Sequence, residues 1–151
     1  RALAAGREAT AKAIGHLPRP LLAVCLGGPT RRCQYTAGEI RAEVEAAASA
    51  IAGGGGGTVL ATASRRTPPE LVEALRRWMW GDEERYGRAA YPGLLAWADA
   101  VVVTADSASM LSEAASLGKP LYIAGMRQTT GKMRRLAESL VERGNINNPK
   151  T

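Results

Sequence analysis

The sequence predicts an α/β fold in which a parallel sheet carries helices on both faces. Short, continuous apolar runs, such as residues 21–26 and 100–104, are typical of parallel strands that are buried on both faces. Segments with helical periodicity separate these runs, and this alternation predicts right-handed crossovers between parallel strands. The length of 151 residues, with 46% hydrophobic and 23% charged residues, fits one globular domain.

The first half of this pattern begins with a helical lead-in and linker over residues 1–20, which ends in a proline-rich stretch. A strand over residues 21–26 follows. The next helix is expected to begin at Thr36, because Glu39 three residues later completes a capping box. Its apolar face consists of Ile40, Val44, Ala47, Ala48 and Ile51.

Five glycines at residues 53–57 end that helix and precede a strand over residues 58–62. A dinucleotide-binding glycine motif instead follows a strand and opens a helix, so these glycines predict a flexible connection. Thr67 is the expected N-cap of the next helix, with Pro68 at its first position and Glu70 as the capping-box acid. The apolar stripe of that helix, expected in the core, is Leu71, Val72, Leu75, Trp78 and Met79.

The second half is predicted to contain two more strands. Residues 80–91 are weakly patterned and could hold a short edge strand, and a short helix is expected around residues 92–98. A strand over residues 100–104 leads into a helix from about Ser107 to Leu117, closed by Gly118. A strand over residues 120–124 and a basic helix ending at Gly144 complete the domain of residues 21–144. That last helix has an apolar face of Met133, Leu136, Ala137, Leu140 and Val141, and residues 145–151 form an unpatterned tail.

Charge and composition narrow the function. The net charge of +6 favours an anionic partner. Nucleic acid is not expected as that partner, because aromatic residues make up 5% of the chain and Phe is absent, which leaves little for base stacking. Cys25 and Cys33 form no metal-binding pair and His16 is the one histidine, so neither a metal nor a cofactor is expected. No apolar run is long enough to span a membrane, and the free cysteines suggest the cytoplasm.

The candidate site lies where the strands end. In an open parallel sheet, ligands bind beyond the carboxyl ends of the strands. Glycines, hydroxyls and cations, all suited to a pyrophosphate, follow every predicted strand. Each group alone has a structural interpretation as a turn, a helix cap or solvated charge, but their coincidence at one edge favours a site. The residues are Gly27, Gly28, Thr30, Arg31 and Arg32; Ser64, Arg65, Arg66 and Thr67; Thr104, Asp106, Ser107 and Ser109; and Gly125, Arg127, Thr129, Thr130, Gly131 and Lys132.

The stretch from Thr104 to Ala114 carries the most information about the ligand. Its small residues allow close approach to the start of a helix, and Glu113 lies one turn inside, where its carboxylate could accept hydrogen bonds from ribose hydroxyls. The glycine–lysine pattern of a P-loop is absent from the chain.

The pattern Ser107-x-Ser109-Met110-x-Ser112-Glu113-Ala114, followed by Gly118-Lys119-Pro120, resembles the nucleotide-binding half of GT-B glycosyltransferases and UDP-sugar 2-epimerases. Together with Gly27-Gly28-Pro29, the segment from Thr62 to Pro68 and the segment from Ala98 to Glu113, it resembles the mitochondrial-fission "elongated mitochondria" family. Bacterial members of that family are described as predicted nucleoside-diphosphate-sugar epimerases. The resemblance covers residues 18–144.

The resemblance implies a Rossmann-like domain similar to the C-terminal domain of GT-B enzymes. In those families a sugar nucleotide lies between two such domains. The C-terminal one holds the pyrophosphate and ribose, and the N-terminal one supplies the acceptor site and the catalytic base. This chain is therefore expected to be the C-terminal half of an epimerase or glycosyltransferase, inactive without its N-terminal domain. The expected ligand-binding residues are Gly27, Gly28, Thr30, Ser64, Arg65, Arg66, Thr67, Asp106, Ser107, Ser109, Met110, Glu113, Thr130 and Lys132.

Two other functions remain open at this point. The domain could be a catalytically silent interaction module that keeps the fold, as in the organelle-division members of the family. More weakly, the basic edge could bind RNA without sequence preference. Binding of a sugar nucleotide distinguishes the first interpretation from both alternatives.

Overall fold

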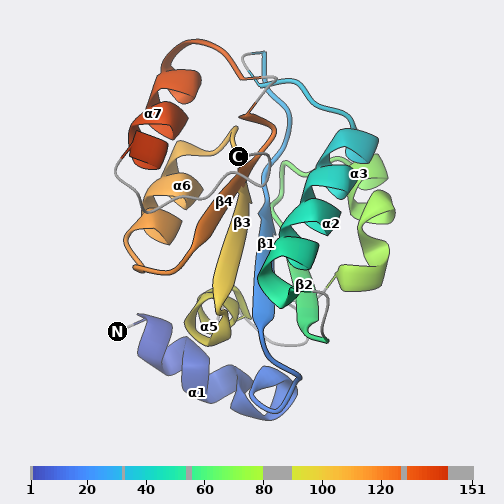
Figure 1. Ribbon diagram of the computed structural model, residues 1–151, viewed down its shortest axis with the longest axis vertical. Coiled ribbons are helices and arrows are strands. Elements are labelled where there is room, and N and C mark those ends of the chain that lie inside the picture. The colour runs from blue at the N-terminus through green and yellow to red at the C-terminus, as the bar shows by residue number, and fades with distance from the viewer. Residues whose placement is uncertain (1, 32, 54–55, 80–89, 127–128, 143–151) are drawn as a thin grey trace.

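A computed structural model describes residues 2–31, 33–53, 56–79, 90–126 and 129–142 of the chain. Within these residues, four parallel strands form one sheet in the order β2-β1-β3-β4 (Figure 1). The predicted α/β, Rossmann-like fold is therefore confirmed. The strands are β1 (Leu21–Leu26), β2 (Thr58–Ala63), β3 (Ala100–Thr104) and β4 (Leu121–Ala124).

Helices cover the sheet on both sides. The steps from β1 to β2 and from β3 to β4 run in opposite directions along the sheet, so right-handed crossovers place α2 and α6 on opposite faces. Figure 1 shows α2 in front of the strands. The helices are α1 (Ala2–Ile14), α2 (Ala37–Ala52), α3 (Pro69–Ala74), α5 (Ala90–Trp97), α6 (Ala108–Ala115) and α7 (Gly131–Glu142), with a 3₁₀ turn, η1 (Arg76–Trp78), after α3.

The two central strands form the middle of the core. Every residue of β1 and β3 is buried, and Val101, Val102 and Val103 are each at most 1% exposed, as their continuous apolar run predicts. The thiol-bearing Cys25 is fully buried beside Val103 of β3. Removing these apolar side chains from water on both faces is the main stabilising contribution in a sheet of this kind.

Helix α2 begins and ends as the sequence predicts. The Thr36 hydroxyl accepts a hydrogen bond from the Glu39 amide at 3.1 Å, and the Glu39 carboxylate accepts one from the Thr36 amide at 2.8 Å. Gly53 ends the helix with a left-handed φ of 59°, which glycine adopts without steric cost. Gly54 and Gly55 of the predicted connection lie outside the described residues.

The predicted cap at Thr67 is wrong. Helix α3 begins at Pro69 and its N-cap is Pro68, which makes no side-chain capping bond. The Thr67 hydroxyl is used elsewhere: it accepts from the Ser64 amide at 2.9 Å and donates to the Leu26 carbonyl at 3.1 Å. Thr67 thus fastens the turn after β2 onto the end of β1 instead of capping the helix.

Other boundaries also differ. Helix α3 ends at Ala74, so Trp78 and Met79 of the predicted stripe lie in and after η1 instead of in the helix. Helix α6 has Ser107 as its N-cap, but it ends at Ala115, two residues before the predicted Leu117. The Ser116 hydroxyl donates to the Glu113 carbonyl at 2.7 Å, a local bond that competes with the helical pattern, while Gly118 keeps a left-handed φ of 72°. The edge strand considered for residues 80–91 lies mostly outside the described residues, and so does Gly144.

The lead-in helix packs against the domain. Helix α1 lies along α5, and Ile14 at its end is fully buried in the core. The Arg7 guanidinium sits 4.0 Å from the centre of the Trp97 ring, and the Trp97 indole nitrogen donates to the Arg7 carbonyl at 2.9 Å. Within the described residues, no helix is long and apolar enough to cross a membrane.

Candidate functional site

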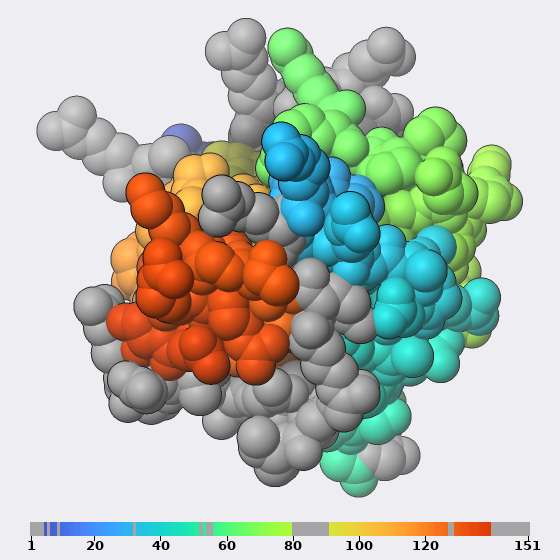
Figure 2. Space-filling model, turned by 90° about the horizontal axis from the view of Figure 1, so that it is seen from above, coloured from blue at the N-terminus to red at the C-terminus, as the bar shows by residue number. Residues whose placement is uncertain are grey.

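The parallel sheet brings all four strand ends to one edge of the molecule. This carboxyl edge is at the top of Figure 1, opposite α1. Figure 2 looks onto it and shows the segment after β1 lying between α7 on one side and α3 on the other. The predicted site residues that the structure describes all follow these strand ends, whereas Arg32 and Arg127 lie outside the described residues.

The buried carboxylate of Asp106 joins three of the strand ends. Its Oδ2 accepts from the Gly28 amide at 2.9 Å and from Nη2 of Arg66 at 3.3 Å, and its Oδ1 accepts from the Tyr35 hydroxyl at 2.8 Å. The side chain is 0% exposed. Asp106 therefore faces the protein instead of solvent, and it fixes the segments after β1, β2 and β3 relative to one another.

The two glycines after β1 are required by close backbone approach. The Gly27 amide donates to Oγ1 of Thr104 at 2.8 Å, and both glycines are buried. A Cβ on Gly27 would overlap the Asp106 carboxylate, and one on Gly28 would overlap the Arg66 carbonyl. The absence of a side chain at Gly27 and Gly28 thus allows the segments after β1, β2 and β3 to pack closely together.

The turn after β2 presents Arg66 in a fixed position. Ser64 accepts from the Arg66 amide at 3.3 Å, and its hydroxyl lies 3.2 Å from that of Thr67. The Arg66 side chain is 54% exposed although one of its nitrogens contacts Asp106. The remaining guanidinium N–H groups are therefore available to an anion at the surface. Arg65 is also exposed.

The first turn of α6 follows Asp106 directly. The Ser107 hydroxyl accepts from the Met110 amide at 3.3 Å, while Ala108 and Ser109 are exposed. The first amides of a helix have no partner within the helix, and they carry the positive end of its dipole. A surface that can donate hydrogen bonds to an anion therefore lies beside Arg66.

Glu113 lies four residues after Ser109, on the same face of α6. It is exposed, and its negative charge contributes to the raised pKa values of Cys25 and Tyr91. Burial, with a smaller contribution from Glu113, raises the pKa of the Cys25 thiol to about 12. Burial, then Cys25 and Glu113, also raise the pKa of Tyr91 on α5.

The segment after β4 is held by residues of the β1–α2 connection and of α2. The Gly125 amide donates to Oε2 of the buried Glu43 at 2.9 Å. Thr129 Oγ1 donates to the Gly125 carbonyl at 2.7 Å and lies 3.0 Å from Sγ of Cys33. Burial raises the pKa of the Cys33 thiol. These contacts place the start of α7, with the exposed residues Thr130 and Lys132, at the same edge.

The structure thus joins part of the predicted set by direct contact. Gly28, Arg66 and Asp106 form one cluster, and Ser64 contacts Thr67. Within the described part of the chain, neither Glu113 nor Lys132 shows a hydrogen bond or ion pair to that cluster. Thr30 pairs with Cys33 through two backbone bonds of 2.9 and 3.2 Å, and Arg31 next to it is exposed.

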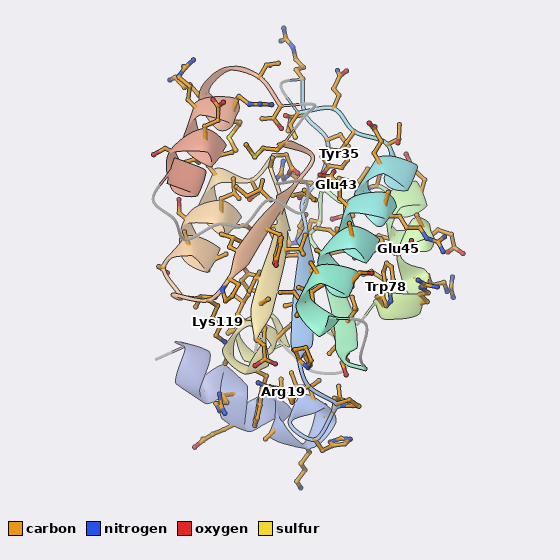
Figure 3. The ribbon with its side chains drawn as sticks, viewed as in Figure 1. Arg19, Tyr35, Glu43, Glu45, Trp78 and Lys119 are labelled. Atoms are coloured by element: carbon orange, nitrogen blue, oxygen red, sulfur yellow. The ribbon has the colours of Figure 1, made fainter. Side chains whose placement is uncertain are left out.

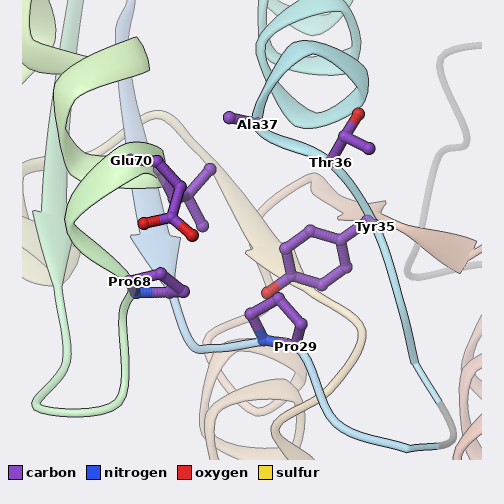
Figure 4. Close-up of a pocket in the computed structure, with 7 residues that line it drawn as sticks. Pro29, Tyr35, Thr36, Ala37, Pro68 and Glu70 are labelled. Carbon is purple, nitrogen blue, oxygen red and sulfur yellow. The ribbon is translucent and has the colours of Figure 1, made fainter.

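Sequence reasoning missed Tyr35 and Glu43, which Figure 3 shows near the carboxyl edge. Tyr35 directly precedes the capping residue Thr36, and Glu43 is a buried acid on the inner side of α2. A second missed feature is a groove of about 300 Å³ between the starts of α2 and α3, with Tyr35 in its wall (Figure 4). The described residues contain no group of three His, Cys, Asp or Glu side chains that could hold a metal ion.

Fold and site together define a Rossmann-like α/β domain with glycines, hydroxyls and cations at the carboxyl edge of its sheet. Residues 1–150 match the family model described as Mitochondrial fission ELM1, and the chain belongs to this family. It is 36% identical over 134 residues to the Mitochondrial fission protein ELM1 of Arabidopsis thaliana, an alignment that covers 85% of this chain and 31% of that relative. The chain therefore spans about a third of the length of this curated relative.

Proposed function

We propose that this domain binds the pyrophosphate and ribose of a nucleoside-diphosphate sugar at its carboxyl edge. In this proposal it is the nucleotide-binding half of an epimerase or a GT-B-type glycosyltransferase. One observation carries the proposal: the half-exposed guanidinium of Arg66, anchored by the buried Asp106, stands beside the exposed first turn of α6. A fixed cation next to a helix N-terminus is well suited to a phosphate group.

The phosphate-binding groups divide between two elements. The amides of Ala108 and Ser109 and the Ser109 hydroxyl donate to one phosphate, and Arg66 neutralises its charge. Lys132 at the start of α7 reaches the second phosphate from across the edge. The other members of the proposed site shape this surface or border it: Gly27, Gly28, Thr30, Ser64, Arg65, Thr67, Asp106, Ser107, Met110 and Thr130.

The ribose is assigned to Glu113. An exposed carboxylate on the same helical face as Ser109 can accept hydrogen bonds from two adjacent hydroxyls. Helix α6 lies on the face of the sheet opposite α2, so a ribose at Glu113 extends away from α2.

Catalysis is assigned to a second domain. General acid–base chemistry needs a titratable group within hydrogen-bond reach of the reacting atoms. His16 lies between α1 and β1, at the end of the sheet opposite the strand carboxyl ends. We therefore expect an N-terminal domain of the intact protein to supply the base and the acceptor site, and this domain alone to be inactive. The free thiols of Cys25 and Cys33 suit a reducing compartment, and we propose the cytoplasm.

Calorimetric titration of the intact protein with UDP, GDP and ADP tests the proposal. At least one nucleotide is expected to bind, and Arg66→Ala should weaken it roughly ten- to a hundredfold, as loss of a charge-assisted hydrogen bond does. Arg41→Ala is the matched control, because Arg41 is an exposed cation paired with Glu45 on α2. If no nucleotide gives heat at millimolar concentration, the proposal fails and the interaction module takes its place.

A further inference from the structure

The proposed function assigns neither the pyrophosphate nor the ribose to the groove between α2 and α3. It measures about 300 Å³, the lower end of the range for small-molecule sites. Figure 4 shows Tyr35 and Pro29 on one side and α3 on the other. Its lining consists of Pro29, Tyr35, Thr36, Ala37, Pro68, Glu70 and Leu71.

The lining combines apolar surfaces with a carboxylate. Two proline rings, the face of Tyr35 and the side chain of Leu71 form apolar walls. The Glu70 carboxylate is directed from α3 toward the space in front of Tyr35 (Figure 4). Within the described residues it has no hydrogen bond or ion pair, whereas Glu73 on the same helix pairs with Arg76 at 3.0 Å.

These groups favour a neutral ligand with hydroxyl groups. The negative charge of Glu70 repels a phosphate, so the groove does not take the anionic part of a nucleotide. A hydroxyl donates to a carboxylate in a short, charge-assisted hydrogen bond. The C–H face of a sugar ring can pack against the apolar walls while its hydroxyls reach Glu70.

The position of the groove matches one end of a sugar nucleotide. Helix α3 follows β2 and α6 follows β3, with β1 between them in the sheet, so Glu70 and Glu113 flank the Arg66–Asp106 pair. Tyr35 connects the two regions, because its ring lines the groove and its hydroxyl donates to Asp106. Along the carboxyl edge, the Glu70 carboxylate therefore comes first, the Arg66 guanidinium second and the Glu113 carboxylate third.

We infer that the groove between α2 and α3 holds the hexose of the sugar nucleotide, with Glu70 accepting hydrogen bonds from its hydroxyls. This inference rests on the proposed function, and it assigns the two ends of the ligand. The pyrophosphate meets Arg66 and the first turn of α6, the ribose extends toward Glu113, and the hexose extends the other way into the groove.

The test compares matched ligands that differ only by the hexose. The intact protein is titrated with UDP and UDP-glucose, GDP and GDP-mannose, and ADP and ADP-glucose, and the affinity ratio within each pair is measured. For the pair that binds, Glu70→Gln should weaken the sugar conjugate roughly tenfold or more and leave the nucleoside diphosphate unchanged. Ala37→Leu, which narrows the groove, should act in the same direction. Glu73→Gln removes the same charge from the same helix and should change neither ligand.

The outcomes separate this inference from the proposed function. If a nucleoside diphosphate binds but Glu70→Gln and Ala37→Leu leave the affinity ratio unchanged, the hexose lies elsewhere and the nucleotide site still stands. If both variants weaken the nucleoside diphosphate and its conjugate equally, the groove holds no hexose-specific contact and the inference is again overturned. If no ligand of any pair binds, the inference and the proposed function fail together.

Discussion

The hydroxyl of Tyr35 donates to Oδ1 of Asp106 at 2.8 Å and thereby joins two residues that lie 71 positions apart in the chain. Together with the Gly28 amide and Arg66, it surrounds a carboxylate with no exposed surface. A buried charge that lacks such donors destabilises the folded state. Loss of any one of these three contacts is therefore expected to lower the stability of the fold. The groove wall and the strand ends are therefore coupled through one side chain.

Replacing Tyr35 by Phe should destabilise the fold. The substitution removes one donor from the buried Asp106 carboxylate, and such a loss typically costs about 1–3 kcal/mol. Equilibrium unfolding in urea should show a lower midpoint with an unchanged slope. Tyr91→Phe is the matched control, because among the described residues the buried Tyr91 hydroxyl has no hydrogen-bond partner. It should be neutral or slightly stabilising, and equal losses in both variants would contradict the assignment.

Replacing Gly28 by Ala should be severely destabilising. The new Cβ would overlap the Arg66 carbonyl oxygen and lie 2.9 Å from its carbon, and backbone atoms cannot move aside as a flexible side chain can. Gly38→Ala provides the opposite expectation, since the nearest atom to a Cβ there is 4.0 Å away and the residue is in the first turn of α2. It should stabilise the protein by about 0.5–1 kcal/mol. Thermal unfolding measures whether each substitution lowers or raises the midpoint temperature. A mild effect of Gly28→Ala would show that the strand ends can separate.

Replacing Glu113 by Gln should distinguish ribose from phosphate. The variant keeps the shape of the side chain but loses the charge that strengthens hydrogen bonds from the ribose hydroxyls. Binding of a nucleoside diphosphate should weaken roughly tenfold or more, while inorganic pyrophosphate should bind as before. Ser109→Ala should weaken both ligands. If Glu113→Gln lowers the affinity for the nucleotide and for pyrophosphate equally, the assignment of the ribose to Glu113 is contradicted.

Alkaline pH should destabilise the fold through Cys25. Its thiol has a pKa of about 12 in the folded state against an ordinary value of 9.0, chiefly because of burial. Between these values the unfolded state has lost the proton and the folded state keeps it, so stability falls as pH rises. This contribution is about 1.4 kcal/mol per pH unit. The pKa values of Cys33, Tyr35 and Tyr91 are also raised in the folded state, so these groups also lower the stability as pH rises. The pKa of Lys119 is lowered by burial, so below its ordinary pKa of 10.5 this group has the opposite effect and raises the stability with pH.

Urea unfolding at pH 8, 9, 10 and 11 measures this slope. Cys25→Ala should flatten it relative to the parent protein, since the substituted residue no longer titrates. A slope that stays the same in Cys25→Ala would show that another group causes the alkaline loss.

The sequence predicts the sheet well because its strands carry strong local signals. The bounds predicted for β1 and β3 agree with the structure, since continuous apolar runs end there at Gly27 and at Ala105-Asp106. The errors lie at Thr67 and at the end of α6, where hydroxyls bond to backbone groups. A further error lies at the end of α3, which stops at Ala74 before the predicted Trp78 and Met79. Thr67 reaches the Leu26 carbonyl, a partner 41 residues away, which no local pattern reveals.

The candidate site could be predicted only in part for the same reason. Strand order explains why Arg66 and Asp106 lie at one edge, but not that they pair. Tyr35 and Glu43 obtain their roles from partners 71 and 82 residues away, so neither stands out in the sequence. The groove exists because the starts of α2 and α3 lie side by side, and this follows from packing alone.

The packing of α1 on α5 determines how the chain would respond to a cut. Because Ile14 fills part of the core and Arg7 covers the Trp97 ring, a nick within residues 15–20 would leave α1 attached by these contacts, without a covalent link. A recombinant version that starts at Leu21 would instead expose the indole and lose a wall of its interior. Helix α1 is therefore expected to stabilise the fold, and a peptide of residues 1–20 supplied in trans should raise the urea midpoint of a chain that lacks it.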